Sequence, residues 1–142
     1  MDDLQQLGAA ALARPAAQPA VEFERQWITW GEMRRVAERL GASLEASGAG
    51  RGAKIAFIAR NRPSALAALL GMIARRCTVR MIYPFQSADA IARDIDRIEP
   101  AAVVAAVEDY SEAFLAVLRA RGIAAIALQE MDAVSLPGLE RS

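Results

Sequence analysis

Hydrophobic residues follow two alternating patterns along most of the chain. Short apolar runs predict β-strands at 54–59, 78–82, 102–107 and 123–128. Longer stretches between them predict helices at about 63–75, 87–99 and 111–121. Strand, helix and strand repeated in this way imply parallel strands joined by right-handed crossovers, with helices on both faces of the sheet. The pattern therefore predicts an α/β fold.

Residues at the helix ends agree with these boundaries. Asn61, Ser87 and Ser111 are the expected N-caps, because each has a side-chain oxygen that can accept a backbone N–H. Pro100 and Gly122 are the expected stop signals.

The chain before residue 54 has a different organisation. Residues 1–18 are rich in Ala, Gln and Pro and predict a short helix or a loosely attached N-terminal arm. Apolar residues on both sides of the polar run 24–26 predict a small β-hairpin. The α/β unit is then expected to span 19–128, with 129–142 as a C-terminal tail.

A capping box predicts the first long helix. Thr29 followed by Glu32 is the pattern in which a hydroxyl and a carboxylate each accept a backbone N–H. The helix is expected to begin at Trp30, and Gly48 supplies the left-handed residue that ends it.

The helix at 63–75 lacks a polar face. Every residue from Ala65 to Ala74 is apolar or glycine. A helix that is apolar around its whole circumference is usually buried on every side. Since so short a chain leaves little to cover its outer face, we expect the rest of a longer parent chain, or a homo-oligomer partner, to pack there.

Composition excludes several classes of function. The 142 residues carry 17 basic and 17 acidic side chains, so no net field draws the chain to nucleic acid. The longest apolar run is about half of the roughly 20 residues that a membrane span needs. Asp2 and Asp3 stand where a secretory signal carries positive charge, so the cytoplasm is the expected location.

The residue types of common catalytic sites are scarce. The chain has no histidine and a single cysteine, Cys77, so the usual zinc ligand sets and an internal disulfide are out of reach. Gly48, Gly50 and Gly52 follow a helix and precede a strand, the reverse of the order in a phosphate-binding loop. We therefore interpret these glycines as a turn.

Polar residues follow the predicted strands at their carboxyl ends, where open parallel sheets bind ligands. They are Asn61, Arg62, Tyr83, Gln86, Glu108, Asp109 and Tyr110. A convergent ligand site is one interpretation of this set. We favour a structural interpretation, in which Asn61 caps a helix, the charged residues are solvated and the tyrosines pack. The chain is therefore expected to hold no catalytic, cofactor-binding or metal-binding residue of its own.

Three basic residues surround the cysteine. Arg75, Arg76 and Arg80 suit a helix C-terminus, where the macrodipole favours cations. The more specific alternative is that these arginines contact an anion such as a CoA phosphate. Cys77 has no histidine to generate a thiolate, so we expect it to be a small buried apolar residue.

The order of these segments resembles the beginning of the adenylate-forming, or AMP-binding, superfamily of acyl-CoA synthetases and acid–CoA ligases. The likeness rests on 19–24 with the run Trp27-Ile-Thr-Trp-Gly-Glu-Met33, on 52–58, on Asn61-Arg62-Pro63 with its apolar helix, and on 70–107. It covers residues 19–128. Arg76 and Met81 depart from it, because the family usually has Gly and Pro there.

The resemblance implies a two-step reaction in the complete enzyme. A fatty or aromatic carboxylate attacks the α-phosphate of ATP to give an acyl-adenylate, and CoA then takes the acyl group. The family's glycine-rich ATP loop, its magnesium ligand and its catalytic lysine are absent from these residues, whose only lysine is Lys54. The implied substrates and ion of the complete enzyme are ATP, Mg²⁺ and CoA, and this fragment is expected to be inactive alone.

Two alternatives remain. One is a free-standing, non-catalytic interaction module that dimerises or docks through helix 63–75. The other is an unrelated flavodoxin-like ligand-binding domain. A reading frame that continues beyond Ser142 into a lysine-ended loop would favour the ligase fragment, whereas binding of ATP, CoA or flavin mononucleotide would favour the ligand-binding domain.

Overall fold

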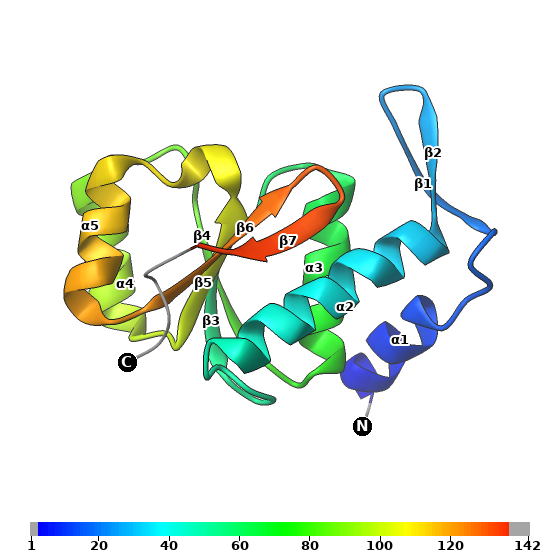
Figure 1. Cartoon of the computed structure of the whole chain (residues 1–142), viewed down its shortest axis with the longest axis horizontal. Helices are drawn as coiled ribbons and strands as arrows, with labels where there is room; N and C mark the ends of the chain where they lie inside the picture. Colours follow the sequence, from blue (N-terminus) through cyan, green and yellow to red (C-terminus); the bar gives the residue numbers. More distant parts are fainter. Residues whose placement is uncertain (1–2, 137–142) are drawn as a thin grey trace.

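A mostly parallel β-sheet with helices on both faces and a separate β-hairpin make up residues 3–136, which the computed structural model describes (Figure 1). The helices are α1 (Asp3–Leu12), α2 (Trp30–Ala46), α3 (Pro63–Ala74), α4 (Ala88–Ile98) and α5 (Glu112–Arg121), with a short 3₁₀ helix η1 (Val107–Asp109). The strands are β1 (Pro19–Phe23), β2 (Gln26–Thr29), β3 (Lys54–Ile58), β4 (Thr78–Ile82), β5 (Ala102–Ala106), β6 (Ala124–Gln129) and β7 (Asp132–Ser135). The predicted α/β class and the N-terminal hairpin are confirmed.

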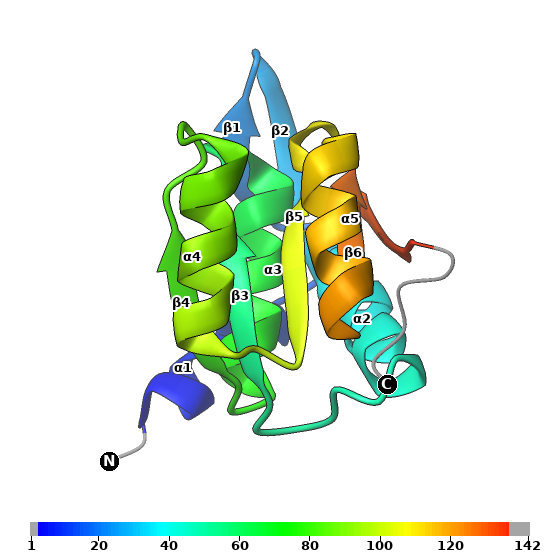
Figure 2. The ribbon, with the colours of Figure 1, turned by 90° about the vertical axis from the view of Figure 1, so that its left-hand side faces the viewer.

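The five-stranded sheet has the order β4-β3-β5-β6-β7. Strands β3, β4, β5 and β6 run parallel, and β7 runs antiparallel to β6. Alternate side chains of β3 enter different cores, with Ile55 and Phe57 against α2 and α3, and Ala56 and Ile58 against α4 and α5. Figure 2 shows α4 and α5 side by side on one face of the sheet and α3 behind it.

Local capping chemistry fixes most helix boundaries as predicted. Thr29 and Glu32 form the full capping box at the start of α2. Ser87 and Ser111 each accept a backbone N–H at the start of α4 and α5, 3.2 Å from Ala90 N and Phe114 N respectively.

The N-cap predicted at Asn61 is wrong. Arg62 is the N-cap of α3, its side chain makes no capping hydrogen bond, and Pro63 is the first helical residue. Proline needs no capping partner at this position, because it has no N–H and its φ is already helical. Asn61 is instead exposed to solvent.

The sheet also continues beyond residue 128, where a tail was expected. A tight turn at Glu130 and Met131 joins β6 to β7, and Ala133 of β7 is buried in the core. Glu130 adopts φ 52°, a conformation in which hairpin turns usually place Gly, Asn or Asp. The sequence therefore lacked the usual hairpin signal. Residues 137–142 of the expected tail lie outside the described part of the chain.

The apolar helix α3 is covered by the chain itself, which corrects the premise that little was left to pack on it. Helices α1 and α2 both lie against it (Figure 1). A Cβ on Gly71 would lie 2.9 Å from Ala37 Cβ of α2, and a Cβ on Gly8 of α1 would lie 3.0 Å from Ile73 Cγ2. The N-terminal arm is thus a helix that packs on α3, and Leu66, at 39% exposure, is the one large apolar side chain of α3 that stays open.

Among residues 3–136, none of the helices is long and apolar enough to cross a membrane.

Candidate functional site

The carboxyl edge of the sheet contains the point where its chain connections diverge. Strands β3 and β5 are neighbours, but α3 follows β3 on one face of the sheet and α5 follows β5 on the other. Ligands of open α/β sheets bind in the crevice at such a point. Here it lies between the loop after β3, residues 59–62, and the segment 107–111 after β5.

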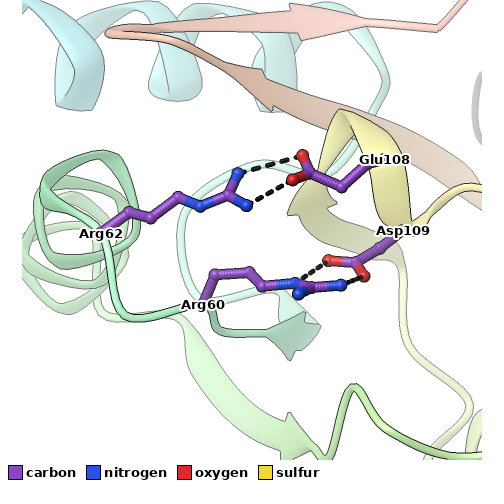
Figure 3. A network of polar contacts seen from close by, with 4 residues as sticks. All are labelled: Arg60, Arg62, Glu108 and Asp109. Atoms are coloured by element: carbon purple, nitrogen blue, oxygen red, sulfur yellow. Dashed lines mark hydrogen bonds and ion pairs between the residues drawn. The ribbon is translucent and has the colours of Figure 1, made fainter.

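The first pair of residues in this crevice is Arg60 and Asp109. Arg60 Nε lies 3.1 Å from Asp109 Oδ2, and a terminal guanidinium nitrogen contacts the other oxygen, so the pair is bidentate (Figure 3). The Asp109 side chain is only 7% exposed. The hydrogen bond to Asp109 raises the pKa of Arg60. This arginine therefore remains a cation whose charge is already balanced.

The second pair, Arg62 and Glu108, is parallel to the first and more exposed. Arg62 Nη1 lies 3.0 Å from Glu108 Oε1, and Nη2 contacts the second oxygen (Figure 3). The hydrogen bond from Arg62, followed by a backbone hydrogen bond, lowers the pKa of Glu108 to about 2. The same hydrogen bond raises the pKa of Arg62. Together the two pairs bridge the crevice and neutralise both arginines.

Tyr110 anchors the segment that carries the two acids. Its hydroxyl lies 2.8 Å from Ile126 O and 3.1 Å from Val103 O, so it donates into the sheet. Its ring stacks on Phe114 at 5.6 Å between centroids. Burial raises the pKa of this phenol, and its hydroxyl ties the segment after β5 to the sheet.

The residues after β4 do not join the site through polar groups. Gln86 donates to Tyr83 O at 2.7 Å and to Asp94 Oδ2 at 3.3 Å, which fixes its own loop. Phe85 contacts Tyr83 edge-on, and the Arg60 guanidinium carbon lies 5.2 Å from the centre of the Phe85 ring. The link between this loop and the crevice is thus a cation–π contact.

Beside the crevice lies an apolar cavity of about 330 Å³. Its walls come from the hairpin, β3, α3 and β4 and include Val21, Phe57, Leu66, Leu69 and Met81. Residues 60–62 and Glu22 also line it. Arg60 and Arg62 are each paired with a carboxylate, so this lining offers no unbalanced cation to an acidic ligand.

The basic residues around Cys77 differ in their partners. Arg75 pairs with Glu45 of α2, and Arg76 Nη2 donates to Gln5 Oε1 at 3.3 Å. Arg80 projects from β4 without an ion pair to any described residue. Cys77 is half-buried, and burial raises the pKa of its thiol.

The structure therefore brings Arg62, Glu108 and Asp109 together, whereas Asn61, Tyr83 and Gln86 make no hydrogen bond to these three residues. Sequence reasoning missed Arg60 and both pairings. The available signal was opposite charge at the ends of strands that a parallel sheet places next to each other. Within residues 3–136 no cluster of three His, Cys, Asp or Glu side chains could hold a metal ion. The two ion pairs hold the loop after β3 against the segment after β5.

Comparison with known proteins agrees with the sequence resemblance. The chain matches the family of AMP-binding enzymes over residues 8–137, and it belongs to that family. No curated protein matches it.

Solved structures share the fold. A benzoate CoA ligase from Burkholderia xenovorans LB400 superposes with a TM-score of 0.75 at 15% identity, over 94% of this chain and 27% of that one. CmiS6 gives 0.74 at 16% identity, over 99% and 33%. Apo MatB from Rhodopseudomonas palustris gives 0.73 at 19% identity, over 92% and 26%. The chain thus spans about a quarter to a third of these proteins.

Proposed function

We propose that the chain is the N-terminal α/β part of an ATP-dependent acid–CoA ligase and does not catalyse acyl-adenylate formation by itself. Its membership of the AMP-binding family and its fold support the reaction class. The acid is fatty or aromatic in this proposal, and the enzyme is cytoplasmic. ATP, Mg²⁺ and CoA belong to the complete enzyme.

One observation carries the proposal of inactivity. Adenylate formation requires cations at the transferring phosphate. The two arginines at the carboxyl edge, Arg60 and Arg62, are each engaged by a carboxylate. A phosphate would have to displace Asp109 or Glu108 before either could bind it.

The only lysine cannot substitute for these arginines. Lys54 begins β3, so it lies at the amino edge of the sheet, and its Nζ donates to Ile98 O at 2.8 Å. A five-residue strand separates it from the crevice by about 13 Å. The described residues therefore do not fit an ATP–Mg²⁺ site, and the phosphate chemistry must come from other parts of the enzyme.

The alternative of a module that docks through helix 63–75 has lost its main support, since α1 and α2 pack on that helix. Isothermal titration of the purified chain with ATP–Mg²⁺, CoA and flavin mononucleotide tests the proposal against the ligand-binding alternative. We expect no heat of binding. Saturable binding of any of the three would contradict the proposal that this part of the enzyme holds no nucleotide site.

A further inference from the structure

The two ion pairs of the crevice differ in what surrounds them. The outer pair is the more exposed, with 37% of the Arg62 side chain and 47% of the Glu108 side chain open to solvent. The inner pair is less exposed, at 26% for Arg60 and 7% for Asp109, and it has a third member. The Arg60 guanidinium carbon lies 5.2 Å from the centre of the Phe85 ring, in the loop between β4 and α4. Arg60 therefore contacts the segment after β5 and the loop after β4 at the same time.

Asp109 fixes the orientation of Arg60. It ends η1, and the next residue, Tyr110, donates its hydroxyl to two carbonyls of the sheet at 2.8 and 3.1 Å. The bidentate contact in Figure 3 sets the plane of the guanidinium as well as its position. A cation is attracted to the face of an aromatic ring, so the placement of the guanidinium decides whether it holds Phe85. Asp109 is thus connected to Phe85 through Arg60.

The loop 83–87 has few other attachments to this edge of the sheet. Tyr83 and Phe85 contact each other edge-on at 5.5 Å between ring centres, and both rings are mostly exposed. The Gln86 side chain donates within the loop and to α4. Among residues 3–136, no hydrogen bond joins this loop to the segment after β5. Arg60 is therefore the link between the two.

We propose that Asp109 is a positioning residue for the loop 83–87 and acts on it through Arg60. Opening the inner ion pair would free this loop, whereas opening the outer pair would not. A movement of the segment after β5 would then be transmitted to the loop on the β4 side of the crevice. This proposal does not depend on the ligase function.

Alanine substitutions at the two neighbouring acids provide a matched test. Nitrogen relaxation measured by NMR on the purified chain gives order parameters for Arg60 Nε and for the backbone amides of Phe85 and Gln86. Rigid groups have values of about 0.85, and flexible ones fall below about 0.6. We expect Asp109→Ala to lower the values of Arg60 and of the loop into the flexible range, and Glu108→Ala to leave both as in the wild type. An unchanged loop in Asp109→Ala, or an equal loss in Glu108→Ala, would overturn the proposal.

Phe85→Leu tests the direction of the coupling at a side chain that is 68% exposed, where the fold tolerates the change. The loop amides should become flexible while Arg60 Nε stays rigid, because Asp109 still holds it. The ring-current shift of the Arg60 side-chain protons should disappear. A loop that keeps its order, or an Arg60 that loses order together with the loop, would refute the relay. This variant decides the question by itself if circular dichroism shows that Asp109→Ala does not fold.

Discussion

The close contact between α2 and α3 predicts that a larger residue at Gly71 destabilises the fold. A Cβ at this position would lie 2.9 Å from Ala37 Cβ and 3.1 Å from Ala37 Cα. Ala37 is a buried residue of α2 whose atoms cannot rotate out of the way. Gly71→Ala must therefore push the two helices apart.

Two opposing effects decide whether Gly71→Ala raises or lowers the free energy of unfolding. Alanine in a helix interior is favoured over glycine by about 1 kcal/mol. Overpacking of a well-packed core costs roughly 1–3 kcal/mol. Because the overlap is with backbone-proximal atoms, we expect the packing cost to exceed the propensity gain, with a net loss of about 1 kcal/mol in the free energy of unfolding.

Gly41 of α2 provides the matched control. A Cβ there would meet Arg75 Nη1 at 3.1 Å and Arg75 Cδ at 3.5 Å, atoms of a long side chain that can move. Gly41→Ala should keep or increase stability, since the helix-propensity gain meets little resistance. In the Gly71→Ala background, Ala37→Gly should cost less than it does alone, because it removes the overlapping Cβ.

Urea unfolding followed by far-ultraviolet circular dichroism measures the stability of the wild type and of the four variants, including Ala37→Gly alone and the double variant. The reasoning is refuted if Gly71→Ala is as stable as the wild type, or if Gly41→Ala loses as much stability as Gly71→Ala. Either result would mean that the close approach of α2 and α3 does not govern the packing of the apolar helix.

Three further predictions use the same unfolding assay. Tyr110→Phe removes a buried donor to Ile126 O and should cost about 1–2 kcal/mol, whereas Tyr83→Phe, at an exposed ring, should change little; equal effects would contradict the anchoring role of Tyr110. Thr29→Ala removes the capping box and should cost about 1 kcal/mol, and an unchanged urea midpoint would count against it. The pKa of Glu108 is lowered from 4.5 to about 2 on folding, so its contribution is complete above pH 4.5 and is lost as the pH falls toward 2. Glu108→Gln should flatten the loss of stability in that window, and an identical pH profile would rule out the pair with Arg62 as its source.

The helices were predictable because their signals are local. The capping box of Thr29 and Glu32 and the serine caps of α4 and α5 each lie within three residues of their hydrogen-bond partners. Asn61 failed as a cap because Pro63 sets the start of α3 by its own ring geometry. Strand β7 was missed because Glu130 adopts a left-handed conformation with no sequence signal for it.

The crevice was less predictable because its contacts are distant in sequence. Arg60 and Asp109 are separated by 49 residues, and the sequence identifies each only as a charged residue after a strand. Their pairing depends on the neighbouring positions of β3 and β5, which require the strand order. In the same way, the packing of α1 on α3 depends on a close approach at Gly8 that no periodicity in residues 1–18 reveals.

The central proposal is that this part of an AMP-binding enzyme provides an α/β scaffold but does not itself form the acyl-adenylate. Acid-dependent exchange of labelled pyrophosphate into ATP measures adenylate formation directly. The purified chain is tested with a panel of fatty and aromatic acids, and a complete benzoate CoA ligase serves as the positive control. The account predicts exchange by the complete ligase and none above background by the chain. Exchange by the chain that depends on an added acid would contradict it.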